Sequence, residues 1–310
     1  MADSSVPART FRRVVILGHT GFIGTHLEQI FRQRSPDLEL VGRSAPSLDL
    51  TKEEDVRSLA PLFDLDTAVL MLAAVKRQFG DSLETFSHNL NMVLHLCRLL
   101  HDRPVGRFVF FSSAAVYGED IHNTQITEET PVHPTSYYGL AKYTAECLLR
   151  KAIEHPQAHH RSLIIVRPAL LYGPGDRGGT YGPSGFVRAA LNGEPITLWG
   201  DGTERREFVF INDVVNLIYQ LTFHEYCGVA NLVSGKSYTF KEAIHIVSRL
   251  MGVELPVTSR PRTKAKVDHG FCNTALLHLL PNVSFADLEE GIRCTLQAES
   301  RRTESAGARS

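Results

Sequence analysis

The feature that most constrains this chain is a run of three glycines near its N-terminus. The apolar segment RVVIL, residues 13–17, leads into GHTGFIG, and HLEQIFRQR follows. The apolar run predicts a buried strand and the last segment an amphipathic helix, so Gly18, Gly21 and Gly24 lie in a tight strand-to-helix turn. Glycines at this spacing permit the turn and let the helix pack closely on the strand.

This turn also favours a particular ligand. Backbone N–H groups at a helix N-terminus can approach a pyrophosphate, and the helix dipole favours its negative charge. Because a strand precedes the glycines and a helix follows them, we predict dinucleotide binding; a simple turn is the alternative. His19, inside the turn, is interpreted as a solvated loop residue rather than a catalyst.

Strand-like and helix-like segments then alternate along the chain. The runs LELV, TAVLML, RFVFF and SLIIV are separated by TKEEDVRSLA, SLETFSHNLNMVLHLCRLL and SYYGLAKYTAECLLRKAIEH. This order predicts parallel βαβ units and an α/β fold with a Rossmann-like, doubly wound parallel sheet. Thr51 with Glu54, and Thr239 with Glu242, have capping-box spacing, and Gly252 is a plausible helix end.

We predict two domains with polar tails. A dinucleotide-binding Rossmann domain covers 11–168, with 207–234 returning to it, and a smaller C-terminal substrate-binding subdomain covers 169–206 and 235–299. The tails 1–10 and 300–310 are predicted to be disordered. The segments 119–135 and 173–185 interrupt the alternation and are predicted to be loops that frame the cleft.

Composition agrees with a soluble enzyme. The 310 residues are 43% hydrophobic, enough for a substantial core, and the net charge of −1 shows no bias toward nucleic acid. Five scattered cysteines predict neither a metal site nor a disulfide framework. Without an apolar leader or a membrane-length stretch, we expect a cytoplasmic protein with no membrane partner.

Tyr138 and Lys142 are the strongest candidates for chemistry. Four residues apart on a predicted helix, they lie on one face. At a dielectric of ~20 and ~4–5 Å, an ammonium would favour the phenolate by about 3–4 kcal/mol, roughly two pKa units before burial opposes it. Tyr137 lacks such a partner because Ala141 stands four residues on. Alone the pair is weak evidence, since a half-buried Tyr beside a solvated Lys is common.

Further motifs give the pair its context. LAA at 72–74 follows a strand-like run, FFSSAAVYGE covers 110–119, and RPALLYGPGD and LNGEPITLWGDGTERREFVFINDVV come later. With the glycine turn and YYGLAK, they resemble the extended short-chain dehydrogenase/reductase family, in its nucleotide-sugar branch of NAD-dependent epimerases and dehydratases, over about 14–295. The family's catalytic hydroxyl lies four residues before the Tyr of VYG, which selects Ser113 over Ser112, and 138 − 113 = 25 residues also fits.

The resemblance implies a role for each residue of this set. Hydride passes between nicotinamide and a sugar carbon, Tyr138 exchanges the hydroxyl proton, Ser113 stabilises the carbonyl or alkoxide oxygen, and Lys142 holds the nicotinamide ribose and lowers the pKa of Tyr138. Asp49 and Asn89 match cofactor positions, although a helix-capping Asp and a helix-surface Asn are equally good interpretations. The implied cofactor contacts are Gly18, Thr20, Gly21, Phe22, Ile23, Gly24, Arg43, Asp49, Leu72, Ala73, Ala74, Asn89, Tyr138, Lys142 and Pro168.

Arg43 suggests which dinucleotide is bound. An NAD site usually places a carboxylate at the end of the second strand, where this chain has LVGRS. Arg43 offers a cation for a 2′-phosphate, which favours NADP(H) and leaves NAD(H) possible. A solvent-exposed Arg is the ordinary alternative, and Glu39 could bind the ribose if the strand ended elsewhere.

The reaction is narrowed by what the motifs lack. Ala114 and Ala115 stand where dehydratases and decarboxylases of the family carry acids, and Gly175 replaces the His of fucose-synthase-like enzymes. Leu170 replaces an epimerase asparagine at the diphosphate, whereas Arg206 matches a diphosphate-binding Arg; Arg205 is its competitor. The implied substrate contacts are thus Ser113, Leu170 and Arg206.

We therefore expect an NADP(H)-dependent ketoreductase of a nucleotide-activated 4-keto sugar. A nucleotide-sugar 4-epimerase with bound NAD(P) is the alternative, and a non-catalytic cofactor-binding module is less favoured. The resemblance also implies a homodimer formed by the helices that bear Asn89 and Tyr138, although their apolar stripes could be ordinary core. Basic residues at 260–266 are given little weight.

Overall fold

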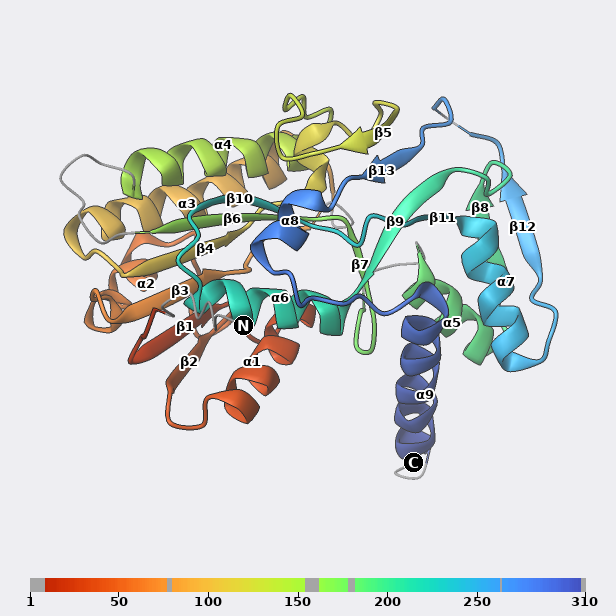
Figure 1. Ribbon diagram of the computed structural model, residues 1–310, viewed down its shortest axis with the longest axis horizontal. Coiled ribbons are helices and arrows are strands. Elements are labelled where there is room, and N and C mark those ends of the chain that lie inside the picture. Colours follow the sequence, from red (N-terminus) through yellow and green to blue (C-terminus); the bar gives the residue numbers. More distant parts are fainter. Residues whose placement is uncertain (1–8, 77–79, 154–161, 178–181, 263, 308–310) are drawn as a thin grey trace, which may run out of the picture. The chain divides into compact units, whose positions relative to one another are not determined.

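The computed structural model describes residues 9–76, 80–153, 162–177, 182–262 and 264–307. Two compact units make up the chain (Figure 1). The first unit comprises Met1–Glu119, Pro131–Arg167 and Val215–Asn231, and the second comprises Asp120–Thr130, Pro168–Val214 and Leu232–Ser310.

The first unit is built on a six-stranded sheet in the order β10-β6-β4-β3-β1-β2. Strand β1 runs parallel to both β2 and β3, β3 to β4, and β4 to β6. Strand β2 lies on one side of β1, and β3 lies on the other, so the direction of strand order reverses at β1. The carboxyl end of β1 is therefore a topological switch point. This confirms the predicted doubly wound fold. The strands are β1 (Arg13–Leu17), β2 (Glu39–Arg43), β3 (Thr67–Met71), β4 (Arg107–Phe111), β6 (Leu163–Pro168) and β10 (Gly228–Leu232).

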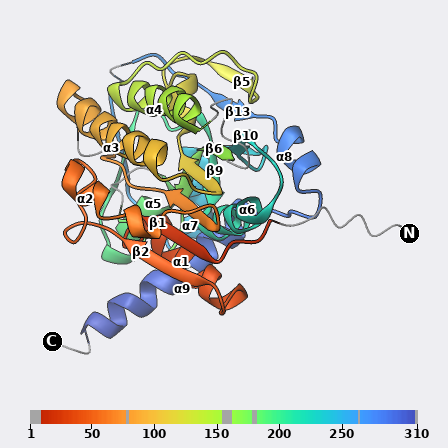
Figure 2. The same ribbon diagram turned by 90° about the vertical axis from the view of Figure 1, so that its left-hand side faces the viewer.

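Helices cover both faces of this sheet (Figures 1 and 2). On one face, α2 (Glu53–Arg57), α3 (Leu83–Asp102) and α4 (Tyr137–Ile153) share a buried core with alternate side chains of β1, β3, β4 and β6. On the other, α1 (Phe22–Arg34) and the latter part of α6 (Ile211–Phe223) meet through Phe31, Tyr219 and Phe223. Strands β1, β3, β4 and β6 are buried along their whole length and read as continuous apolar runs, so they could be predicted from the sequence.

The described residues of the second unit form three small sheets. Strand β9 (Arg205–Phe210) lies between β7 (Leu170–Tyr172) and β11 (Ser237–Thr239), β12 (Val257–Arg260) pairs with β8 (Ile196–Trp199), and β13 (His269–Phe271) pairs with β5 (Asn123–Ile126). Its helices are α5 (Pro183–Asn192), α7 (Phe240–Met251), α8 (Thr274–Leu279) and α9 (Leu288–Gly307).

The structure corrects several predicted boundaries. Asp120–Thr130, predicted within the first domain, belong to the second unit, where β5 pairs with β13. Of the predicted return segment 207–234, residues 207–214 also belong to the second unit, because β9 pairs there with β7 and β11, and Val215–Asn231 belongs to the first. The predicted loop 119–135 contains β5, and α5 begins inside the predicted loop 173–185. Distant pairing partners decide these positions, and local sequence does not reveal them.

Part of each segment predicted to be a disordered tail is ordered. Arg9 donates its backbone N–H to Phe223 and its side chain pairs with Glu225. At the other end α9 continues to Gly307, supported by an ion pair between Glu299 and Arg302. Residues 1–8 and 308–310, and 178–181 of the predicted loop 173–185, lie outside the described residues.

Of the two predicted capping boxes, one is present at the start of α7 and the other is absent from α2. The capping box of Thr239 and Glu242 is present, and Gly252 ends α7 in the left-handed region at φ 67°. The box predicted at Thr51 is wrong, because α2 has Lys52 as its N-cap and the Thr51 hydroxyl donates to Asp49 instead. Among the described helices, none has the length and apolar character needed to cross a bilayer.

Candidate active site

The glycine turn lies at the switch point, and backbone crowding explains its glycines. Gly18 has φ 96°, and a Cβ on it would stand 2.9 Å from the backbone N of Ala73. A Cβ on Gly24 would stand 2.4 Å from the carbonyl oxygen of Gly18. Larger residues would therefore push β1, β3 and α1 apart at this end of the sheet.

The start of α1 suits a pyrophosphate. Its N-cap is Gly21, no side chain caps it, and its first turn contains no acidic residue. The N–H groups and the positive end of the helix dipole are therefore not offset by a carboxylate of that turn. Thr20 is exposed, and Phe22 and Ile23 are partly exposed beside it. The residues present thus fit a dinucleotide, with the glycine turn and the first turn of α1 to hold it.

His19 is not the solvated loop residue that was expected. Its Nδ1 lies 3.0 Å from the Ser44 hydroxyl, which also accepts a hydrogen bond from the Thr20 backbone at 3.2 Å. A Cβ on Gly42 would stand 2.4 Å from the imidazole, so the ring packs on the end of β2. His19 therefore joins the glycine turn to the segment after β2.

The end of β2 places Arg43 beside this turn. Arg43 pairs in register with Leu17, and its carbonyl accepts the Gly18 N–H at 2.7 Å. Glu39 lies at the opposite end of β2, bound to Arg12 and Arg13 at 3.0 and 2.9 Å. The alternative in which Glu39 binds the ribose is therefore wrong.

Asp49 and Asn89 both have local partners. The Asp49 carboxylate accepts the hydroxyl and backbone N–H of Thr51, and these bonds lower its pKa. Asn89 is buried in α3 and exchanges two hydrogen bonds with the backbone of Val75, just after the LAA segment. Asn89 is thus buried and holds the backbone of Val75, and it is not a helix-surface residue. The Leu17 carbonyl accepts the backbone N–H groups of Leu72 and Ala73, and Ala74 lies between these residues and Val75.

Ser113, Tyr138 and Lys142 come together in the first unit. Ser113 follows β4 as the N-cap of η3 (Ala114–Tyr117), and its hydroxyl hydrogen-bonds Tyr138. Lys142 is buried, donates to the Phe111 carbonyl at 2.6 Å, and has its Nζ 5.8 Å from the centroid of the Tyr138 ring.

Two caps missed in the sequence fix the start of α4: Asp81 accepts the Tyr138 N–H at 3.0 Å, and Ser136 accepts the Gly139 N–H at 3.1 Å.

The expected depression of the Tyr138 pKa is wrong in this structure. Burial raises the pKa of Tyr138 to about 12, and the Ser113 hydrogen bond offsets only part of this. The Lys142 ammonium lies over the ring and bonds a carbonyl, so it gives the phenolate little support. Burial also lowers the pKa of Lys142 to about 8, against the opposing charge of Glu146. The structure therefore holds Tyr138 as a protonated phenol.

Two of the expected substrate residues lie in the second unit. Leu170 starts β7 and is 39% exposed. Arg206 is partly buried in β9, and its Nη1 donates to the carbonyls of Arg205 and Val267. These carbonyls orient the guanidinium, and its charge helps to lower the pKa of the Asp268 carboxyl. Pro168, predicted to contact the cofactor, is the buried last residue of β6.

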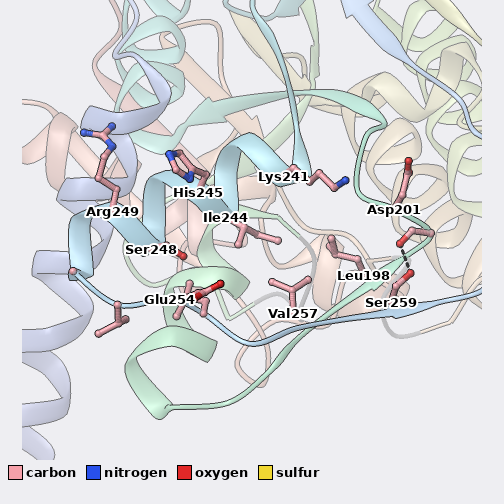
Figure 3. Close-up of a pocket in the computed structure, with 14 residues that line it drawn as sticks. Leu198, Asp201, Lys241, Ile244, His245, Ser248, Arg249, Glu254, Val257 and Ser259 are labelled. Atoms are coloured by element: carbon pink, nitrogen blue, oxygen red, sulfur yellow. Dashed lines mark hydrogen bonds between the residues drawn. The ribbon is translucent and has the colours of Figure 1, made fainter.

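The second unit also has a groove of about 870 Å³ between α7 and the pair β8–β12 (Figure 3). Ile244, Leu198 and Val257 line it, with Lys241 and Asp201 at its rim. None of the predicted site residues line it, so we do not assign the active site to this groove. The described residues contain no cluster of three or more His, Cys, Asp or Glu side chains able to hold a metal ion.

Sequence comparison identifies the family. Residues 14–230 match the NAD dependent epimerase/dehydratase family. The chain belongs to that family. This match confirms the resemblance to the extended short-chain dehydrogenase/reductases, which are enzymes.

Several curated relatives are nucleotide-sugar enzymes. UDP-glucuronic acid decarboxylase 4 of Arabidopsis thaliana is 26% identical over 283 residues, which cover 83% of this chain and 61% of the relative, so this chain spans about three fifths of its length. The dTDP-4-dehydro-6-deoxy-D-allose reductase of Streptomyces bikiniensis is 27% identical over 78% of this chain and 82% of its own. A decarboxylase and a reductase thus match this chain at similar sequence identity.

A solved structure extends the likeness to nearly the whole chain. The UDP-glucose 4-epimerase of Thermus thermophilus, in complex with NAD, is 26% identical with a TM-score of 0.78. The match covers 92% of this chain and 98% of that one.

Proposed function

We propose that this protein is an NADP(H)-dependent reductase of a nucleotide-activated 4-keto sugar. The observation that carries the proposal is the set of Ser113, Tyr138 and Lys142 at the carboxyl end of the sheet, with Ala114 and Ala115 in place of a second acid or base. Simple hydride exchange needs one proton donor, whereas elimination needs a further acid or base.

The relay residues have complementary roles in this reaction. Tyr138, which holds its proton because burial raises its pKa to about 12, donates that proton to the developing alkoxide. Ser113 donates a hydrogen bond to the same oxygen, and both hydroxyls stand on regular elements that fix their direction. When bound, the dinucleotide supplies the hydride. A donor that stays protonated at neutral pH suits reduction better than oxidation.

Arg43 supports the preference for NADP(H). It ends β2 next to the glycine turn, and the structure places the nearest strand carboxylate, Glu39, at the far end of β2. A guanidinium there would bind a 2′-phosphate, and no β2 carboxylate is available for a ribose 2′-hydroxyl. His19, packed on Gly42, lies at the same edge.

A 4-epimerase with retained NAD is the second candidate. It is favoured by the 26% identical Thermus epimerase, which was solved with NAD. Against it stand Arg43 and the exposed Leu170, which takes the place of a polar diphosphate contact. A non-catalytic cofactor-binding module is the third candidate, and the complete relay disfavours it.

We further propose a nucleotide-diphosphate sugar as the substrate and a homodimer as the assembly. Relatives named for UDP- and dTDP-sugars support the first, together with the cationic Arg206. Leu140 and Tyr143, both on α4, are 42% and 37% exposed and lie three residues apart on one helix face. Such an apolar stripe suits pairing with a second copy of α4.

One experiment separates the candidates. The purified protein is incubated with 4-keto or ordinary sugar nucleotides and NADPH or NADH, while absorbance is followed and products are identified. Net NADPH consumption with a 4-keto sugar supports the reductase. Interconversion of ordinary sugar nucleotides without net cofactor change would instead establish the epimerase, and inactivity toward every sugar nucleotide would favour the non-catalytic module.

A further inference from the structure

A buried carboxylate behind the relay has no role in the reaction above. Glu146 in α4 is 1% exposed, and its Oε1 accepts hydrogen bonds from the Ser112 hydroxyl and from Arg167 Nε at 2.9 Å. Its Oε2 accepts from Arg167 Nη2 at 2.5 Å. Both oxygens are therefore used, and the pair with Arg167 is bidentate.

The contacts of Glu146 continue across the unit. Arg167 Nη1 donates to the Tyr117 hydroxyl at 2.9 Å, and Tyr117 in turn donates to Asn231 at 2.8 Å. Ser112 and Arg167 are 3% and 4% exposed. A hydrogen-bonded chain that is buried along its length holds its members in one arrangement.

Three members of this hydrogen-bonded chain lie close in sequence to a relay or cofactor residue. Ser112 precedes Ser113, Arg167 precedes Pro168, and Glu146 follows Lys142 by one turn of α4. The single carboxylate thus joins the end of β4, the end of β6 and α4. These are the three elements on which the proposed chemistry depends.

Glu146 also influences the charges of the two buried cations near it, Lys142 and Arg167. Lys142 and Arg167 are both buried cations, and burial of a cation is costly unless an anion is near. Burial lowers the pKa of Lys142 to about 8, and the Glu146 charge works against that fall. Without Glu146, Lys142 would lose its proton more readily near neutral pH.

The other groups around Lys142 do not replace this anion. Phe111 offers a carbonyl, Phe110 offers a ring whose centroid lies 5.0 Å from Nζ, and Tyr138 keeps its proton because burial raises its pKa to about 12. Arg167 is a further cation. The buried residues that α3 contributes are not titratable: Asn89, Met92, Val93, Leu96, Leu99 and Leu100.

We propose that Glu146 is a positioning residue of the relay: it anchors the segment that carries Ser113 and supplies the negative charge that balances the Lys142 ammonium. It touches neither substrate nor cofactor. The effect on turnover rests on the proposed function, whereas the effect on Lys142 does not.

The test measures the ionisation of Lys142 directly. Protein labelled with ¹⁵N at the lysine side chains is titrated by NMR, with the Lys142 signal assigned from Lys142→Arg. In the native protein the midpoint is expected near pH 8. In Glu146→Gln it falls by about one unit or more, the size typical of losing one nearby charge. Glu146→Asp, which keeps the charge, restores most of the shift.

Glu146→Gln leaves Arg167 buried without an anion and could unfold the chain. The double variant Glu146→Gln/Arg167→Met removes that cation as well, and a cooperative thermal transition verifies that it folds. Glu28→Gln is the matched control, because it breaks an exposed helical ion pair with Arg32 in the same unit.

Two results decide the inference. A Lys142 midpoint that is lower in the folded double variant than in Arg167→Met alone, with at least about tenfold slower turnover at pH 7 and little change in KM, supports it. Equal midpoints in those two variants overturn it. If the native protein turns over no sugar nucleotide, the proposed function fails and the NMR midpoint alone decides the role of Glu146.

Discussion

Each unit of the chain has a glutamate that is 1% exposed, and the two have different partners. Glu146 in the first unit meets a guanidinium with both oxygens. Glu207 in the second unit accepts the backbone N–H groups of Ser234 and Gly235 with one oxygen, while its other oxygen is buried without a hydrogen-bond partner in the described structure. Burial raises the pKa of Glu207 to about 7.

The difference indicates what each unit is built for. In the first unit, the buried Lys142 lies over the Tyr138 ring, and Glu146, one turn further along α4, pairs with the buried Arg167. In the second unit the buried Glu207 binds the backbone of the segment at Ser234 and Gly235. Cations such as Arg262 and Lys264 form ion pairs there with Asp201 and Asp120. Arg206 differs in donating its hydrogen bonds to carbonyls, with Asp268 as a nearby charge rather than a direct partner. We infer that the first unit performs the chemistry and the second binds the substrate.

The largest effect should come from removing the proton donor of the first unit. Tyr138→Phe is expected to lower turnover by roughly 10²–10⁴-fold, the usual contribution of a general acid, while the fold and NADPH binding are retained. Steady-state kinetics and cofactor fluorescence measure both. Tyr137→Phe is the matched control, since Tyr137 is 44% exposed; equal losses in the two variants would contradict the assignment.

The second unit should respond in binding rather than in turnover. Arg206→Gln removes a charge-assisted contact to the diphosphate, which predicts a rise in KM of about 10–100-fold with a smaller change in kcat. Arg205→Gln provides the control, because Arg205 is exposed and bonded to the Ser237 carbonyl. If kcat fell instead and KM held steady, the division of roles between the units would be wrong.

A smaller effect is expected at the cofactor edge of the first unit. Arg43→Ala should weaken NADPH binding about tenfold and leave NADH binding nearly unchanged, because only the former carries a 2′-phosphate. Titration of each cofactor by fluorescence gives the ratio. Arg57→Ala, at an exposed ion pair of α2, serves as control. Equal loss for both cofactors would reject the NADP(H) preference.

The smallest effect on activity is expected at Glu207, where stability should change instead. Its raised pKa means that the folded protein holds a proton that the unfolded chain loses above about pH 4.5. The free energy of unfolding should therefore decrease as pH rises from about 4.5 to 7, by at most roughly 3 kcal/mol. Glu207→Gln should flatten that dependence in urea unfolding; an unaltered slope would show that Glu207 does not titrate there.

Much of the first unit could be predicted from the sequence because local geometry determines it. A glycine spacing fixes a turn, four residues fix one face of a helix, and buried parallel strands appear as apolar runs. Ser113, Tyr138 and Lys142 therefore met as expected. The ionisation of Tyr138 was misjudged because burial depends on the whole fold and outweighed the assumed effect of Lys142.

The remaining features depend on partners distant in sequence. The pairing of β5 with β13 joins residues more than a hundred positions apart, and nothing local announces it. Glu146 could have been noticed four residues after Lys142, but its link to Arg167 requires α4 to pack near the end of β6. The role of His19 similarly depends on Gly42, whose lack of a side chain admits the imidazole.

The central claim is that the relay of the first unit directs hydride exchange at a single sugar carbon. The most direct test supplies NADPH with deuterium at both positions of carbon 4 of the nicotinamide, together with a 4-keto sugar nucleotide, and follows the label by mass spectrometry and NMR. The account predicts deuterium on carbon 4 of the reduced sugar in the native protein, and at least about a hundredfold less labelled product in Tyr138→Phe over the same time. A product that forms without deuterium, or undiminished labelled product in Tyr138→Phe, would contradict it.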